Sequence, residues 1–471
     1  MKWTATFLIL AFASTGQAVP QDEYKARLAA LSKSTAAKHY SVGDYLAMAQ
    51  MYQWAREQYV KVIENDPDHE PARRKLGFRK NGDGNWENDP SSRQESGNRK
   101  KAEDADRVRK VYLDRLESAG RDLSRQWVDL ALWCRKNSLD AESLEAFRKT
   151  LEYDPTNATA RKELGYEKDA KGIWLSKAER EIRKEMKDGI SKAPQGTTSN
   201  VETAVEKALG IKNQKRESGH FLMESPHLTD IQLGTVLQHA EHSYEIFHKL
   251  FGQTDLFGDQ KLNYVALTDE FQHHRYVDAF FQGSPEQKAL ARKSTGTGGF
   301  PQAELYQGTS ADVLLYDWVI HSTTETLLKF MVEGEYCWLY EGLALHFTRL
   351  MKDTASIHCV DLAGTSPKNK GKNYSDPTDW PVICRVWVRE NKDPDLTAVI
   401  KCTNMAELDG AEVVKAWSIV EFLLAEHRLK FLEFLKVVKR EKDDEKALKA
   451  VWGWSITDLD YRWKQYVRVT Y

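Results

Sequence analysis

Hydrophobic and aromatic residues recur at helical spacing along most of the chain. Two clear examples are "YLAMAQMYQWAREQYVK" (45–61) and "WVDLALWCRKNSLDAESLEAFRK" (127–149), and the same pattern dominates after Ser310. Such spacing is typical of amphipathic helices that bury one face. We therefore expect a mostly helical protein.

Two shorter segments, "HFLMESP" (220–226) and "KLNYVALT" (261–268), predict strands separated by a helix from Asp230 to Phe251. A small sheet followed by helices is then expected over 218–471. Together with the helices before it, this predicts an α+β fold class that is mostly helical overall. The charged stretch 186–217 is expected to be a linker.

The sequence repeats itself at an offset of 88 residues. "VIENDPDHEPARRKLGFRKNGDGNW" (62–86) aligns without gaps to "TLEYDPTNATARKELGYEKDAKGIW" (150–174), with ten identities. In each copy a Pro after Asp66 or Asp154 is expected to end one helix and start the next. A helical hairpin followed by another helix in this way resembles the tetratricopeptide repeat.

Each copy carries a tail that ends in a tryptophan, and we expect Trp86 and Trp174 to fold back into equivalent buried positions. The expected organisation is a repeat region at 19–185, with units at about 40–88 and 126–176 and a solvated linker at 87–106.

Charge and the N-terminus narrow the choice of partners and compartment. Sixty-eight basic and seventy acidic residues give a net charge of −2, which argues against nucleic acid as a partner. Residues 1–18 place Lys2 before a short apolar run and end in small residues, as a secretory signal peptide does. We expect an exported protein, periplasmic, extracellular or in the cell envelope, without an integral membrane segment after cleavage.

Four of the five cysteines lie in the C-terminal half, at Cys337, Cys359, Cys384 and Cys402. Export would permit disulfides between them, but their spacing does not choose partners. Cys134, inside "LALWCRK", is expected to be a buried helix residue.

Two neighbouring segments carry the residues that come closest to a known chemistry. His321 and Glu325 lie four residues apart in "VIHSTTETLL", a predicted helix, so their side chains share one face. Glu341 lies in the next predicted helix, "YCWLYEGLALHF", from which it can approach the first.

With these motifs, the region from about Glu217 onward resembles the gluzincin metallopeptidases of the peptidase MA type. The segments "VLQHAEHSYEIFHKLFG" and "FLEFLKVVKR" are similar to the opening and closing helices of such domains. The resemblance implies an HExxH helix with two His ligands and a Glu base, and a third ligand from the Glu of "WLxEGLA". His321 matches the first ligand and Glu341 the third.

The two positions between them depart from the family pattern. Ser322 occupies the place of the general base, and Glu325 the place of the second His ligand. A serine hydroxyl of ordinary pKa does not take a proton from metal-bound water, as a carboxylate does. A His/Glu/Glu set is also harder than the usual zinc set and shifts the preference toward manganese. The alternatives are no cofactor at all, or a divalent metal (zinc or manganese) held by His321, Glu325 and Glu341.

Three functions follow from these alternatives. The first is a catalytically degenerate metallopeptidase-like protein, a pseudoenzyme, that binds a protein or peptide. The second is an active metallohydrolase with an unusual site, which a further carboxylate near His321, such as Glu333 or Glu335, would favour. The third is a structural envelope protein. A separate set of histidines, His239, His242 and His248, is expected to lie on a solvated helix face.

Export generates a direct prediction. Cleavage after the small-residue site should leave a mature chain that begins at Val19, because Gly16 and Ala18 occupy the positions that signal peptidase reads. N-terminal sequencing of protein recovered from outside the cytoplasm checks this. Intact Met1 on cytoplasmic protein would contradict it.

Overall fold

The structure, a computed structural model, is mostly helical with a small mixed sheet, as the predicted fold class requires. Its internal contacts divide the chain into two units, Met1–Gly165 and Tyr166–Tyr471. The expected signal peptide lies outside the described residues, and within them no helix has the length and apolar character to cross a bilayer. The described residues are 20–91, 102–154, 157–168, 174–252, 256–306, 312–352, 354–355, 376, 378–390 and 392–471.

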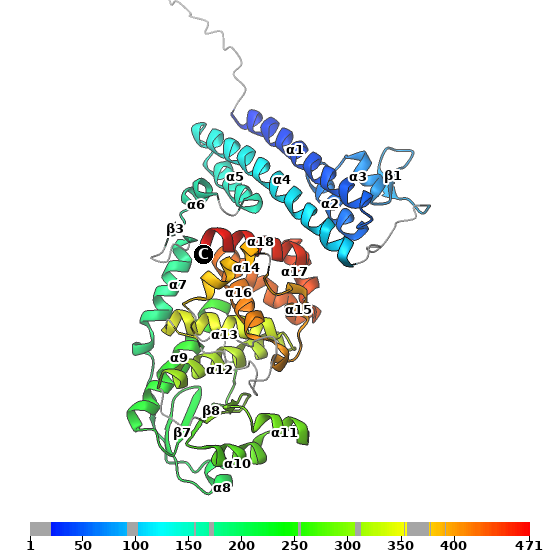
Figure 1. Cartoon of the computed structure of the whole chain (residues 1–471). Coiled ribbons are helices and arrows are strands. Elements are labelled where there is room, and N and C mark those ends of the chain that lie inside the picture. Colours follow the sequence, from blue (N-terminus) through cyan, green and yellow to red (C-terminus); the bar gives the residue numbers. More distant parts are fainter. Residues whose placement is uncertain are drawn as a thin grey trace, which may run out of the picture. The chain divides into compact units, whose positions relative to one another are not determined.

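The first unit contains long helices, shorter helices and one hairpin of strands (Figure 1). Their bounds are α1 (Pro20–Met48), α2 (Tyr52–Asn65), α3 (Glu70–Lys75), β1 (Phe78–Lys80), β2 (Trp86–Asn88), α4 (Ala102–Lys136), α5 (Asp140–Tyr153) and α6 (Ala158–Glu163).

The 88-residue repeat of the sequence is also a repeat of local structure. Helices α2 and α5 begin and end 88 residues apart, as do α3 and α6, while α1 and α4 end 88 residues apart. The caps recur too, since the side chains of His69 and Asn157 accept hydrogen bonds from the backbone N–H groups of Ala72 and Ala160. Equivalent residues therefore make equivalent turns.

The two copies pack through their long helices, which lie side by side in Figure 1 (α1 blue, α4 cyan). Tyr112, near the start of α4, packs in the core of the first copy. Tyr24, its equivalent near the start of α1, packs in the core of the second. The first part of each long helix thus packs in the core of the other copy, and its last part packs in the core of its own copy. Helices α1 and α4 therefore run antiparallel. Two repeats can stabilise each other in this way, because neither buries its apolar face alone.

The second unit is larger and begins with another short hairpin. Its elements are β3 (Glu167–Lys168), β4 (Trp174–Leu175), α7 (Lys177–Asp188), η1 (Ile190–Lys192), β5 (Thr197–Thr198), α8 (Ala204–Leu209), β6 (Gln214–Glu217), β7 (Phe221–Ser225), α9 (Asp230–Phe251), β8 (Leu262–Leu267), α10 (Glu270–Phe280), α11 (Pro285–Ala291), β9 (Gly296–Thr297), β10 (Gln302–Tyr306), α12 (Asp312–Val332), α13 (Cys337–Lys352), α14 (Trp380–Glu390), α15 (Leu396–Lys401), η3 (Met405–Glu407), α16 (Gly410–Glu441), α17 (Asp444–Trp452) and α18 (Ile456–Thr470).

The tails of the two sequence repeats form two-stranded hairpins with the same register. Lys80 lies opposite Trp86, and Lys168 lies opposite Trp174. In both pairs the lysine ammonium lies over the indole ring, 5.0 Å and 5.2 Å from the ring centroid, which is within the range of a cation–π interaction. The expectation of two buried tryptophans holds only for Trp174, which is 6% exposed. Helices α7 and α16 contact its strand β4, whereas Trp86 is half-buried.

The sheet of the second unit has six strands in the order β5-β6-β7-β8-β10-β9. Strands β7, β8 and β10 are parallel neighbours, and the outer pairs are antiparallel. The predicted strands β7 and β8 and the helix α9 between them are confirmed. The range 186–217, expected as a linker, contains β5 and β6 of this sheet, and the expected linker 87–106 is described only at its two ends, in β2 and α4.

Central strand β8 is buried on both faces, and its side chains alternate between two cores. Tyr264 packs in the large core with α9 and α12, whereas Val265 and Leu267 pack with α8 and α10. Helices therefore cover both sides of the sheet, as Figure 1 shows. Helix α12 is placed directly over β8, where the Tyr264 and Trp318 rings lie 5.2 Å apart.

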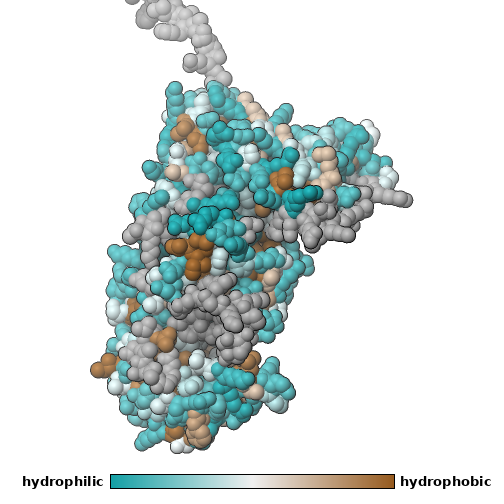
Figure 2. Space-filling model, viewed as in Figure 1, coloured by the Kyte–Doolittle hydropathy of each residue, from teal (hydrophilic) through white to brown (hydrophobic). Residues whose placement is uncertain are grey.

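Most residues on the face shown in Figure 2 are hydrophilic, and hydrophobic residues occur there in small separate groups. A scatter of exposed apolar residues is ordinary for a globular protein.

A buried ion pair fastens α10 to the sheet. His273 and Glu304 of β10 are both fully buried, and His273 Nδ1 lies 3.0 Å from each carboxylate oxygen. Its Nε2 faces the Ala291 carbonyl at 3.1 Å. Only the imidazolium form can donate to both acceptors. Burial lowers the pKa of His273, but the Glu304 carboxylate, followed by the Ala291 carbonyl and Glu270, raises it above its usual value.

This pair predicts a pH-dependent contribution to stability. A raised pKa in the folded state means that the stabilisation is complete below the unfolded pKa of about 6.5 and is lost as the pH rises through the folded pKa. His273→Gln should lower the free energy of unfolding by about 3 kcal/mol at about pH 6 and by less at about pH 9. Urea unfolding at both pH values measures this.

His274→Gln is the matched control, because the neighbouring His274 side chain is 39% exposed. It should cost little at either pH. An equal loss from His273→Gln at the two pH values would contradict the charged pair.

Candidate metal site on α12 and α13

Two of the three predicted ligands come together between helices α12 and α13. His321 lies in α12 and Glu341 in α13, and their Nε2 and Oε1 atoms are 3.5 Å apart. Both side chains are buried, with exposed fractions of 4% and 0%. Burial lowers the pKa of His321, but the charge of Glu341 and its hydrogen bond raise it above its usual value.

The third predicted ligand is engaged elsewhere. The Glu325 carboxylate lies 2.5 Å from the ammonium of Lys329, one turn further along α12. Glu325 is near enough to His321 to act on it electrostatically, but its oxygens face a fixed positive charge. The Lys329 ammonium also lies 5.5 Å from the Tyr340 ring.

This arrangement does not fit a zinc site. A catalytic zinc ion takes three protein ligands, whereas here only His321 and Glu341 converge, and Glu325 is neutralised by Lys329. Within the described ranges, no group of three His, Cys, Asp or Glu side chains is placed to hold an ion.

The position of the general base lies in a cluster of hydroxyl groups. Ser322 is 4% exposed and hydrogen-bonds to the hydroxyl of Tyr264 from strand β8. The same hydroxyl lies 2.5 Å from Thr323 Oγ1, and burial raises the pKa of Tyr264 above its usual value. All three groups stay neutral near neutral pH, so none can serve as a base there. The sequence analysis missed Tyr264, although alternation along β8 places it toward α12.

The carboxylates that would favour an active enzyme lie elsewhere. Glu333 pairs with Lys439 at 2.8 Å and with Lys442 at 3.4 Å. Glu335 is exposed and lines a cavity beside α17. The carboxylates that act on His321 are those of Glu341 and Glu325.

The expectation of a solvated histidine face on α9 was wrong. His239 and His242 are 3% and 2% exposed, because α9 lies between the sheet, α7 and α12. His239 stacks on Tyr316 with ring centroids 4.5 Å apart, and His242 Nε2–H donates to the Met186 carbonyl at 3.0 Å. Burial lowers the pKa of both, to about 4 for His239.

No family model matches the chain, and no curated protein sequence matches it significantly. The likeness to gluzincins and to tetratricopeptide repeats therefore rests on the motifs themselves.

A close helix contact holds Glu341 in place. A Cβ atom on the next residue, Gly342, would lie 2.6 Å from Val420 Cγ2 and 2.7 Å from the Ala416 carbonyl oxygen. Both neighbours belong to α16, against which α13 packs. The missing side chain thus allows the approach that buries Glu341.

Gly342→Ala should therefore lower the free energy of unfolding by about 1–3 kcal/mol, because the backbone carbonyl of Ala416 cannot yield as a flexible side chain would. Chemical denaturation measures the loss. Gly298→Ala is the matched control, since nothing lies within 4 Å of a Cβ atom there. Equal stability of the two variants would show that α13 and α16 are not in close contact.

Proposed function

We propose that this protein binds a protein or peptide without hydrolysing it, and that its C-terminal unit is a catalytically degenerate relative of the gluzincin metallopeptidases. The observation that carries the proposal is the Glu325–Lys329 ion pair. A lysine ammonium holds the second ligand position, so a cation bound at His321 and Glu341 would meet an already compensated carboxylate.

The residue at the general-base position independently supports the same conclusion. Ser322 lies among the hydroxyls of Tyr264 and Thr323, and the carboxylates that raise the pKa of His321 are those of Glu341 and Glu325. Loss of a general base costs a factor of about 10² to 10⁴ in rate. With a ligand and the base both replaced, we propose binding without hydrolysis as the activity of this protein.

The first unit is proposed to supply the partner-binding surface. Its two helical units resemble tetratricopeptide repeats, and stacked helical repeats generally present extended surfaces for protein ligands. The nearly neutral net charge of the chain gives no basic field for nucleic acid. We propose that this binding takes place outside the cytoplasm, because the N-terminal segment has the pattern of a signal peptide.

The proposal predicts that wild-type protein does not hydrolyse casein or peptides, with or without added zinc. Glu325→His should then bind zinc at least about tenfold more tightly than wild type, because it adds an imidazole ligand to His321 and Glu341. Titration calorimetry measures the affinity, and peptide cleavage should stay absent because Ser322 remains.

Glu325→Gln is the control, since it also releases Lys329 but adds no zinc ligand. Equal zinc affinity of the two folded variants would mean that the three positions do not converge. Chelator-sensitive hydrolysis by wild type that His321→Ala abolishes would overturn the proposal in favour of an active enzyme.

A further inference from the structure

Two cysteines that are distant in the sequence lie together in the second unit. Cys337 is the first residue of α13, and Cys402 directly follows α15, a helix that contacts α13. The Cys402 side chain is a direct hydrogen-bonding neighbour of the Cys337 thiol. Both sulfur atoms are thiols in this structure. Cys337 is fully buried, whereas Cys402 is partly exposed.

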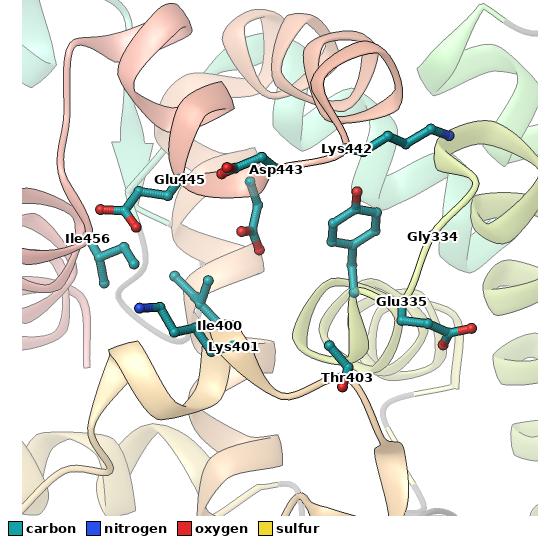
Figure 3. Close-up of a pocket in the computed structure, with 11 residues that line it drawn as sticks. Gly334, Glu335, Ile400, Lys401, Thr403, Lys442, Asp443, Glu445 and Ile456 are labelled. Atoms are coloured by element: carbon teal, nitrogen blue, oxygen red, sulfur yellow. The ribbon is translucent and has the colours of Figure 1, made fainter.

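The residues beside these cysteines form two walls of one cavity of about 490 Å³. One wall precedes Cys337, and the other surrounds Cys402. A third side comes from the start of α17. Figure 3 shows these ribbons converging on the cavity, which is lined by the backbone at Gly334 and by the side chains of Glu335, Ile400, Lys401, Thr403, Asp443 and Glu445.

We propose that Cys337 and Cys402 form a disulfide that joins these two walls when the folded protein meets a thiol oxidant. For Cys134 and Cys384, the other two described cysteines, no second thiol is among the groups that shift the pKa. Cys134 is buried in α4 of the first unit, and Cys384 is buried in α14, where it contacts Ser418. Cys359 lies outside the described residues and is the competing partner.

The difference in exposure between the two thiols determines which of them reacts with the oxidant first. Burial, followed by the effect of Cys402, raises the pKa of Cys337 to about 12, so Cys337 is a poor attacking group. With oxidised glutathione as oxidant, the accessible Cys402 thiolate attacks one glutathione sulfur and releases one glutathione thiolate. Cys337 then loses its proton and attacks Cys402 Sγ, which releases the second glutathione. Two protein thiols are oxidised, and one glutathione disulfide is reduced to two thiols.

The bond would tie together positions 65 residues apart. Closing a long ring lowers the entropy of the unfolded chain and so stabilises the folded state. It would also hold α15 against the start of α13, the helix that carries Glu341. The inference is independent of the proposed function, since it requires only an oxidant and the observed proximity.

The test treats folded, fully reduced protein with oxidised glutathione, blocks remaining thiols and digests without reductant. Mass spectrometry should find a cross-linked peptide pair containing Cys337 and Cys402, and the thiols titrated in denaturant should fall from five to three per chain. The thermal midpoint of the oxidised protein should exceed that of the reduced protein by about 5 °C.

Cys402→Ser separates the alternatives, because this partly exposed position tolerates a hydroxyl without loss of core packing. It should abolish the cross-link and the difference in thermal midpoint. Cys384→Ser is the matched control and should retain both. A cross-link from Cys359 to either residue, stable glutathionylation of Cys402 without a cross-link, or no loss of thiols would each overturn the proposal.

Discussion

Helix α13 is buried around nearly its whole circumference, and this constraint organises the second unit. A helix in that position must satisfy every polar side chain inside the protein, because an unpaired buried charge is costly. Glu341 meets His321, and Arg349 lies 3.6 Å from Glu421 of α16 and 4.4 Å from the Trp417 ring. At Gly342 the helix has no side chain, and α16 approaches its backbone. These contacts fix α12, α13 and α16 relative to one another.

The same constraint gives the His321–Glu341 pair a role in folding. Removing one member of a buried pair leaves the other uncompensated, at a cost of about 3–5 kcal/mol. The pair therefore contributes to the fold whether or not chemistry takes place beside it. Glu325 is not fully buried, so it does not need a fixed partner of opposite charge in the same way. It is 14% exposed and meets Lys329, which is 45% exposed, so its partner can change at little cost to the core.

The first unit solves a different packing problem. Each repeat is too small to bury the apolar faces of its helices, and the long helices α1 and α4 share the task by starting against the opposite copy. Tyr24 and Tyr112 mark the exchange, since each packs in the core of the other repeat. Lys38 and Asp122, 2.8 Å apart, join the same two helices at their surface. The two tails differ in burial, and helices α7 and α16 contact β4, the strand that carries Trp174.

Local periodicity in the sequence determined the helices of the 88-residue repeat, most of the helices after Ser310, the strands β7 and β8 and the bounds of α9, because these depend on residues close together in the chain. The short strands β5, β6, β9 and β10 were not predicted, because segments of two to five residues are too short to show a clear alternation of apolar and polar positions. The partner of Glu325 shows the limit most clearly. His321 and Lys329 are both four residues from Glu325, so helical spacing permits either contact equally. Only the tertiary structure decided between them, because it buries His321 against Glu341 and leaves Lys329 at the surface, where an ammonium keeps its hydration while it pairs with Glu325.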